Sequence, residues 1–115
     1  MSLKIYHNPR CSKSRQTLNM IEEAGSPVEV RLYLDEPLSA AEIKELLEKL
    51  NLTDARALMR RTEAIYKELG LKSETDQAAL IKAMAKHPKL IERPIVVKGN
   101  AAILGRPPEN VQKFL

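Results

Sequence analysis

Aromatic residues and cysteine are scarce in this 115-residue chain, which has no tryptophan, one phenylalanine, three tyrosines and one cysteine. With so few rings for base stacking, and with 15 acidic residues interleaved among 19 basic ones, nucleic acid is not an expected partner. A small anionic substrate is a better use of the net charge of +4. A single cysteine excludes an internal disulfide and a cysteine-rich metal cluster, and we expect no metal site.

Long apolar segments are also missing. No apolar run approaches the roughly 20 residues that cross a bilayer, and the first residues lack the apolar core of a secretory signal. We therefore expect no membrane association and a cytoplasmic location, where a lone thiol stays reduced. The length suits one domain, residues 1–115, and we expect it to be monomeric.

The hydrophobic pattern predicts an α/β protein with the element order β-α-β, helices, β-β-α. Alternation predicts strands over residues 3–6 and 28–33, and the helical spacing between them, from Ser12 to a stop at Gly25, predicts a crossover helix. This is the pattern of a parallel strand pair. Two further strands, 94–97 and 101–104, flank a tight turn, and a terminal helix then carries Val111, Phe114 and Leu115.

The middle of the chain, about residues 38–90, is predicted to be a helical insertion in the single domain. Ser39 and Glu42 match a capping box ahead of apolar residues at helical spacing. Short helices are expected over residues 55–60, capped by Thr53, and over residues 62–69. A further helix is expected to open at residues 73–76 and to end near His87-Pro88, with an inward face made by Leu80, Ile81 and Met84.

Cys11 is the main candidate for chemistry because it lies between the first strand and the helix that follows. Free backbone N–H groups and the helix dipole favour negative charge at that point. Cations in the same loop lower a thiol pKa further; they are His7, Arg10, Lys13 and Arg15. The N–H groups after Asn8 can also wrap a tetrahedral oxyanion beside the sulfur. Taken alone, this pattern also fits a buried inert cysteine, a phosphatase, a peroxidatic enzyme or a glutaredoxin.

Residues 6–15, Tyr-His-Asn-Pro-Arg-Cys-Ser-Lys-Ser-Arg, resemble the active-site loop of the arsenate reductases that use glutathione and glutaredoxin. The resemblance continues through residues 33–34, 56–60, 66–71, 87–88, 93–97 and 104–107, so it covers essentially the whole chain. It implies a thioredoxin/glutaredoxin-like mixed sheet with a helical insertion. Arg10 and Lys13 stand where better-known members have small residues, which indicates a subgroup of the family.

The resemblance also implies roles for particular residues. Cys11 would be the catalytic nucleophile, and Arg60, Arg93 and Arg106 would bind the oxyanion, for which the guanidinium fork is well matched. The peptide bond between Arg93 and Pro94 is expected to be cis.

Four further residues near the thiol receive expected roles. His7 and Arg15 are expected to tune the thiol pKa, although for His7 a packing role stays equally open. Asn8 and Ser14 are expected, like Pro94, to be structural residues beside the site.

The implied reaction is the reduction of arsenate to arsenite through an adduct on Cys11, with glutathione as co-substrate, glutaredoxin as partner and no bound cofactor. Ser14 stands where a resolving cysteine would otherwise be, so a second molecule must supply the other thiol. Two alternatives remain. One is a transcription regulator of the Spx type, which binds RNA polymerase and commonly senses oxidants through a Cys-x-x-Cys pair. The other is a general thiol-disulfide oxidoreductase.

Overall fold

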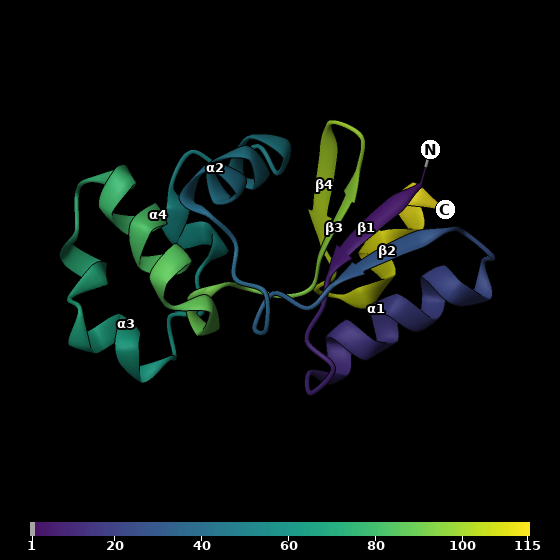
Figure 1. Cartoon of the computed structure of the whole chain (residues 1–115), viewed down its shortest axis with the longest axis horizontal. Coiled ribbons are helices and arrows are strands. Elements are labelled where there is room, and N and C mark those ends of the chain that lie inside the picture. The colour runs from purple at the N-terminus through teal and green to yellow at the C-terminus, as the bar shows by residue number, and fades with distance from the viewer. Residues whose placement is uncertain (1) are drawn as a thin grey trace. The chain divides into compact units, whose positions relative to one another are not determined.

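The computed structural model describes residues 2–115, which form two compact units (Figure 1). The first unit comprises the two ends of the chain, up to Glu36 and from Arg93 onward, and the second is Pro37–Glu92. The second unit has nearly the boundaries predicted for the helical insertion, and the element order is the predicted one. That the two units make a single domain stays a prediction.

A four-stranded mixed sheet with the order β2-β1-β3-β4 forms the centre of the first unit. β1 is parallel to β2, β3 is antiparallel to β1, and β4 is antiparallel to β3. The strands are β1 (Leu3–Tyr6), β2 (Val28–Arg31), β3 (Ile95–Lys98) and β4 (Ala101–Leu104). The predicted parallel pair is confirmed, and the fold is a mixed α/β fold of the thioredoxin type.

β2 is shorter than the predicted strand over residues 28–33. It ends at Arg31 because the chain turns directly afterwards, where the carbonyl of Leu32 accepts hydrogen bonds from the N–H groups of Asp35 and Glu36 at 3.0 and 2.9 Å. Alternating side chains alone cannot reveal this turn, since Leu32 and Tyr33 suit a strand well.

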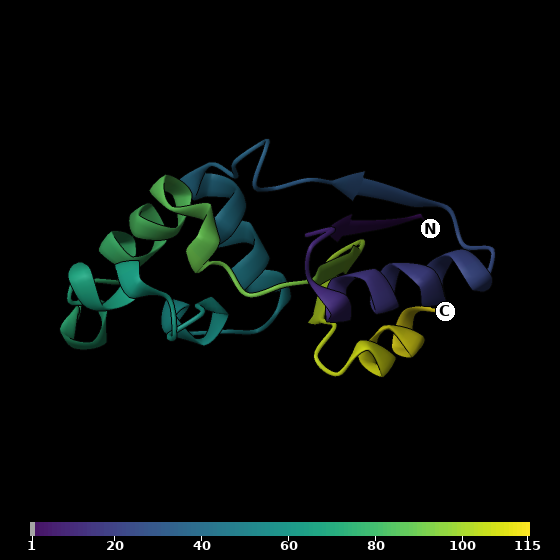
Figure 2. The ribbon, with the colours of Figure 1, turned by 90° about the horizontal axis from the view of Figure 1, so that it is seen from below.

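Helix α1 (Ser12–Glu23) and the 3-10 helix η4 (Pro108–Phe114) lie side by side against one face of this sheet (Figure 2). Their shared core consists of fully or almost fully buried apolar residues: Leu3, Ile5, Ile21, Val96 and Val111. The terminal segment was predicted to be a helix that carries Val111, Phe114 and Leu115. The structure has a 3-10 helix there that contains Val111 and Phe114 and ends one residue before Leu115, which is 46% exposed.

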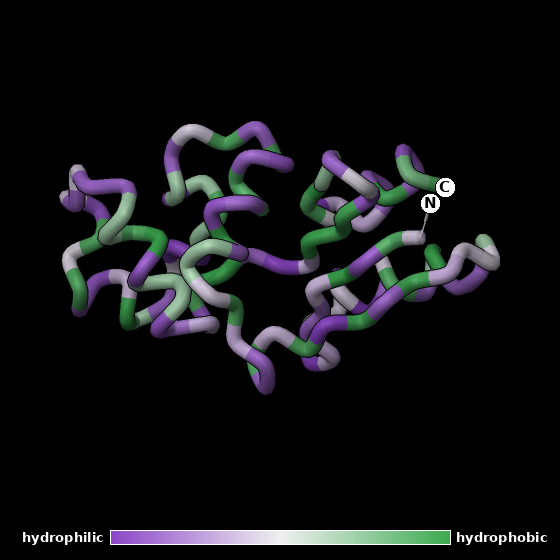
Figure 3. Tube along the Cα trace, turned by 45° about the horizontal axis from the view of Figure 1, so that its top comes forward, coloured by the Kyte–Doolittle hydropathy of each residue, from purple (hydrophilic) through white to green (hydrophobic). Residues whose placement is uncertain are grey.

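Three α-helices and three short 3-10 helices make up the second unit, and the tube in Figure 3 shows polar and apolar residues alternating along them. The α-helices are α2 (Ala40–Lys49), α3 (Ala64–Glu68) and α4 (Gln77–Lys86), and the 3-10 helices are η1 (Ala55–Leu58), η2 (Leu71–Ser73) and η3 (Pro88–Leu90). The capping box of α2 is confirmed: the Ser39 hydroxyl accepts from the N–H of Glu42, and the Glu42 carboxylate accepts from the N–H of Ser39, both at 3.1 Å.

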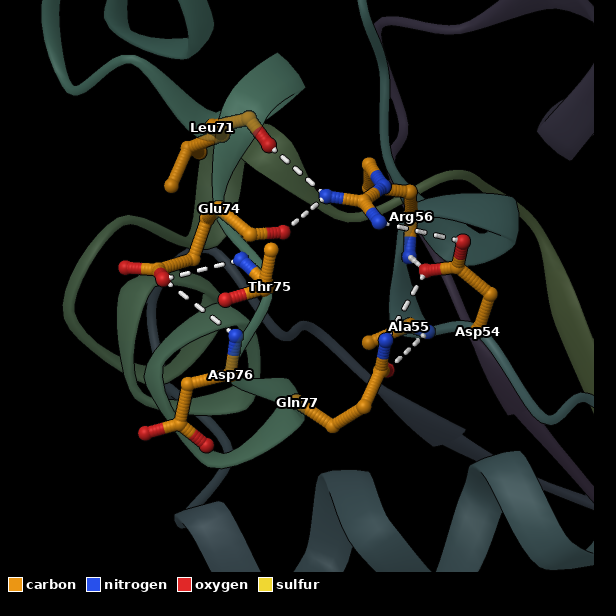
Figure 4. Close-up of polar contacts among 8 residues, drawn as sticks. All are labelled: Asp54, Ala55, Arg56, Leu71, Glu74, Thr75, Asp76 and Gln77. Carbon is orange, nitrogen blue, oxygen red and sulfur yellow. Dashed lines mark hydrogen bonds and ion pairs between the residues drawn. The ribbon is translucent and has the colours of Figure 1, made fainter.

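Arg56 joins three segments of this unit (Figure 4). Its Nη1 atom donates to the carbonyl of Leu71, at 3.0 Å, and to the carbonyl of Glu74, while Nη2 lies 3.4 Å from the Asp54 carboxylate. The Gln77 side chain accepts from the N–H of Ala55 at 2.7 Å and donates to Asp54 at 3.3 Å. These contacts fasten η1 to η2 and to the start of α4.

Two predictions about helix starts in this unit are wrong: the cap of η1 and the first residue of α3. Asp54 caps η1 in place of Thr53, because its carboxylate accepts from the N–H of Arg56 at 3.0 Å. α3 begins at Ala64, after Glu63, instead of at residue 62. α4 begins at Gln77 with Asp76 as its cap, so it opens directly after the predicted segment 73–76. Leu80 and Met84 are fully buried, while Ile81 is half-buried. No helix within residues 2–115 is long and apolar enough to cross a membrane.

Candidate active site

Cys11 lies where the chain passes from β1 into α1, as the sequence predicts, and it is the N-cap residue of that helix. Its backbone N–H donates to the carbonyl of Asn8 at 3.0 Å, and its own carbonyl accepts from the N–H of Arg15 at 3.0 Å. The Asn8 side chain accepts from the N–H of Arg10 at 3.0 Å. These local bonds fold the loop onto itself and leave the thiol partly buried at the helix start.

The surroundings of Cys11 favour the thiolate. Burial by itself raises the pKa of the Cys11 thiol, but four groups outweigh it: the backbone N–H of Ser14, the charge of Arg93, the backbone N–H of Lys13 and the charge of Arg106. The pKa of Cys11 therefore lies below its ordinary value, in the predicted direction. Two of the causes are helix N-terminal amides, and the other two are arginines from the far end of the chain.

Arg93 precedes the β3–β4 hairpin and Arg106 follows it, and both approach the thiol. Arg106 Nη1 lies 4.0 Å from Cys11 Sγ, although the two residues are 95 positions apart, and it donates to the carbonyl of Arg93 at 3.2 Å. Two guanidinium groups next to a thiolate make an electropositive site suited to a tetrahedral oxyanion. The Arg93–Pro94 bond is cis, which confirms that prediction, and Arg106–Pro107 is cis as well.

His7 and Ser14 form a buried pair beside the thiol. His7 Nδ1 and Ser14 Oγ share a hydrogen bond of 2.6 Å, and Ser14 Oγ also accepts from the N–H of Asn8 at 3.0 Å. Ser14 is fully buried and His7 is 6% exposed. Burial, reinforced by the charge of Arg15 and opposed by that of Glu22, lowers the pKa of His7, which favours a neutral imidazole. The link from His7 to the thiol runs through Ser14, whose N–H favours the thiolate.

For two of the expected site residues, Arg15 and Arg60, the contacts that the structure gives are with groups other than the thiol. The exposed Arg15 donates from Nη1 to the carbonyl of Pro9 at 2.8 Å. Arg60 belongs to the second unit, where Nη1 forms a 2.7 Å ion pair with Glu63 and the backbone N–H donates to the carbonyl of Leu90. Tuning of the thiol by His7 and Arg15, and oxyanion binding by Arg60, therefore stay predictions.

Gly105 is a site residue that sequence reasoning missed. Its N–H donates to the carbonyl of Pro94 at 2.9 Å. A Cβ at this position would lie 2.5 Å from Thr17 Oγ1 and 2.7 Å from Pro94 Cγ, so no side chain fits between α1 and the cis-proline loop. The only signal in the sequence is a glycine directly after a strand and directly before an Arg-Pro pair.

The chain belongs to the ArsC family, whose model matches residues 6–114. It is 49% identical over 114 residues to the arsenate reductase of Neisseria meningitidis serogroup A, covering 98% of this chain and 97% of that one. It is 56% identical over 114 residues to the uncharacterized protein YfgD of Escherichia coli strain K12, covering 98% of this chain and 96% of the relative.

A solved structure agrees with this family assignment. The arsenate reductase from Vibrio cholerae superimposes with a TM-score of 0.96 at 52% sequence identity, covering 100% of this chain and 98% of that one. Within residues 2–115, no group of three or more His, Cys, Asp or Glu side chains could hold a metal ion.

Proposed function

We propose that this protein is an arsenate reductase in which Cys11 is the nucleophile and Arg93 and Arg106 bind the oxyanion. The observation that carries the proposal is the approach of Arg106 Nη1 to within 4.0 Å of Cys11 Sγ at a helix start where the thiol pKa is lowered. Membership of the ArsC family and the names of the relatives from Neisseria meningitidis and Vibrio cholerae support arsenate as the oxyanion.

The first step is a substitution at arsenic. The Cys11 thiolate attacks arsenate, a sulfur–arsenic bond forms, and one arsenic–oxygen bond breaks as that oxygen leaves, protonated, as water. No electrons are transferred, and arsenic stays pentavalent. The arginines offset the negative charge that otherwise repels a thiolate from an oxyanion, and each charge-assisted hydrogen bond contributes about 1.5–3 kcal/mol.

The second step is the two-electron reduction. A glutathione thiolate attacks Cys11 Sγ, the sulfur–arsenic bond breaks, and its electron pair stays on arsenic, which leaves as arsenite. Two thiols have then been oxidised to one Cys11–glutathione disulfide. A glutaredoxin thiolate attacks the glutathione sulfur and releases the Cys11 thiolate, which a low pKa makes a good leaving group.

In this proposal, other residues around the site support the reaction. Asn8, Ser14 and Pro94 shape the loop around the sulfur, His7 and Arg15 tune it, and Arg60 adds a third guanidinium to the oxyanion. Glutathione and glutaredoxin are abundant in a reducing cytoplasm, where a monomer of this size would act.

An arsenate reduction assay with glutathione and glutaredoxin tests the proposal. We expect arsenite from the wild-type protein, none above background from Cys11→Ser, and a 10- to 100-fold lower kcat/KM from Arg93→Ala and from Arg106→Ala, since each loses about 1.5–3 kcal/mol. Arg61→Ala removes an exposed guanidinium in the second unit and serves as the matched control. A wild-type protein without arsenate reduction would contradict the proposal.

The same assay, run also with a glutathione mixed disulfide in place of arsenate, separates the alternatives. A general thiol-disulfide oxidoreductase would reduce a glutathione mixed disulfide but not arsenate, with the same dependence on Cys11. A regulator of the Spx type would do neither. A Cys-x-x-Cys switch is impossible here, because its second position is the buried Ser14, hydrogen-bonded to His7.

A further inference from the structure

Asn110, in η4, lies beside the backbone segment that carries Arg106. Its side-chain Nδ2 donates two hydrogen bonds, to the carbonyl of Leu104 at 3.1 Å and to the carbonyl of Arg106 at 3.2 Å. The two acceptors flank Gly105, so one amide group holds the chain on both sides of this glycine. The backbone N–H of Asn110 also donates to the carbonyl of Pro107 at 3.0 Å, which ties η4 to the same loop.

The other side of the segment is fixed by the cis-proline loop. Gly105 donates to the carbonyl of Pro94 at 2.9 Å and packs too closely on Thr17 and Pro94 to admit a side chain. Residues 104–106 are therefore held between Pro94 and Asn110. From this support the Arg106 side chain extends until Nη1 reaches the carbonyl of Arg93 and lies 4.0 Å from Cys11 Sγ.

We infer that Asn110 is a positioning residue for Arg106: its amide fixes the backbone from which the guanidinium reaches the Cys11 sulfur. Both hydrogens of an NH₂ group are needed for the two carbonyls, so aspartate, which has the same shape but no donor, cannot replace asparagine. The effect on the thiol does not depend on the proposed function, whereas the effect on oxyanion binding rests on it.

A double-mutant cycle of Asn110→Ala and Arg106→Ala, read on the Cys11 thiol, tests this inference. The pKa of Cys11 is measured by thiolate absorbance, and oxyanion binding is measured as the protection that inorganic phosphate gives against alkylation by iodoacetamide. Neither readout requires arsenate turnover. Arg106 Nη1 lies 4.0 Å from Cys11 Sγ, and loss of its positive charge at that distance in water would reduce the thiolate fraction of Cys11, at a pH below the pKa, by about fivefold. We expect up to that loss, with weaker phosphate protection, for Asn110→Ala and little further change when it is added to Arg106→Ala.

Matched variants in the same helix separate positioning from general disturbance. Asn110→Asp should reproduce the loss, while Gln112→Glu, which adds the same charge at an exposed position of η4, should not. Circular dichroism checks that each variant is folded. Equal effects of Asn110→Ala with and without Arg106, or an unchanged thiol pKa in folded Asn110→Ala and Asn110→Asp, would overturn the inference. If phosphate protects no variant, including the wild type, the oxyanion site fails while the thiol titration still decides the role of Asn110.

Discussion

At the scale of single residues, the reactivity of the thiol depends on one short stretch of loop and helix. Ser14 has two functions there, because its backbone N–H favours the Cys11 thiolate while its hydroxyl bonds to His7 and to the N–H of Asn8. A serine at this position excludes a second thiol and also fixes the amide that the first thiol needs. The residue that makes an internal disulfide impossible thus contributes to the activation of Cys11.

His7 is expected to make the stability of the protein depend on pH. Burial lowers its pKa, so the folded protein binds the imidazole proton more weakly than the unfolded chain does, where the pKa is about 6.5. This contribution to stability is present above about pH 6.5 and is lost as the pH falls through the lower pKa of the folded state. His7→Asn keeps an acceptor for Ser14 but cannot titrate, so the fall in the free energy of unfolding below pH 6.5 should shrink.

Urea unfolding at a series of pH values measures this effect. His87→Asn leaves His7 in place, so the part of the pH dependence that comes from His7 should be retained in that variant. If His7→Asn and the wild type lose stability in parallel below pH 6.5, the buried neutral imidazole is not the cause.

At the scale of elements, the strand–helix junctions determine where the site residues lie. We expect Gly105→Ala to lower the free energy of unfolding by about 1–3 kcal/mol, because the new methyl group would lie closer to Thr17 and Pro94 than van der Waals contact allows. It should also raise the pKa of Cys11, since the displaced segment carries Arg106. Gly25→Ala is the control: Gly25 has a φ of +71° with open space around it, so alanine there costs about 1–2 kcal/mol of backbone strain.

Thermal unfolding and thiol titration of the two variants separate the effects. Both should unfold at a lower temperature, but only Gly105→Ala should alter the titration of Cys11. A normal thiol pKa in Gly105→Ala would show that the close contact is not what places Arg106.

The Arg56 junction should contribute to stability without affecting the chemistry. Arg56→Ala removes hydrogen bonds to two carbonyls and the partner of Asp54, which should cost about 1.5–3 kcal/mol of unfolding free energy. Arg56→Lys keeps the charge but not the fork, so it should recover only part of that loss. Urea unfolding measures both variants, and a cost no larger than that of the exposed Arg61→Ala would contradict this role.

The sequence predicts elements well where the signal is local. The capping box at Ser39 and Glu42, the glycine stop after α1 and the thiol at the start of α1 all depend on neighbouring residues, and all are present. In the second unit the cap of η1 was misplaced by one residue and the start of α3 by two. Several Ser, Thr and Asp residues compete for each cap, and the choice depends on tertiary partners such as Arg56.

The site was predictable only in part for a related reason. The prediction that arginines lie near Cys11 rested on the family resemblance alone. Nothing in the spacing of Arg93 and Arg106 marks them as neighbours of a residue near the other end of the chain. Gly105 and Asn110 act through close packing and through hydrogen bonds to carbonyls, which leave no periodic pattern in a sequence.

At the scale of the whole molecule, Arg60 is the expected contribution of the second unit to the reaction. Arg60→Ala should lower kcat/KM for arsenate by 10- to 100-fold if its guanidinium binds the oxyanion. Glu63→Gln is the control, because it removes the carboxylate that pairs with Arg60 at 2.7 Å and leaves the guanidinium in place. Near-normal kinetics of Arg60→Ala would restrict the oxyanion site to Arg93 and Arg106.

The chain contains one cysteine, and the reduction of arsenate takes two electrons, so the molecule as a whole cannot complete a cycle without an outside thiol. Intact-mass measurement of the protein during turnover shows whether Cys11 receives that outside thiol. We expect a glutathione adduct on Cys11 that accumulates when glutaredoxin is omitted and disappears when it is added. Efficient turnover with thioredoxin as the sole reductant, and no glutathione adduct at any time, would contradict it.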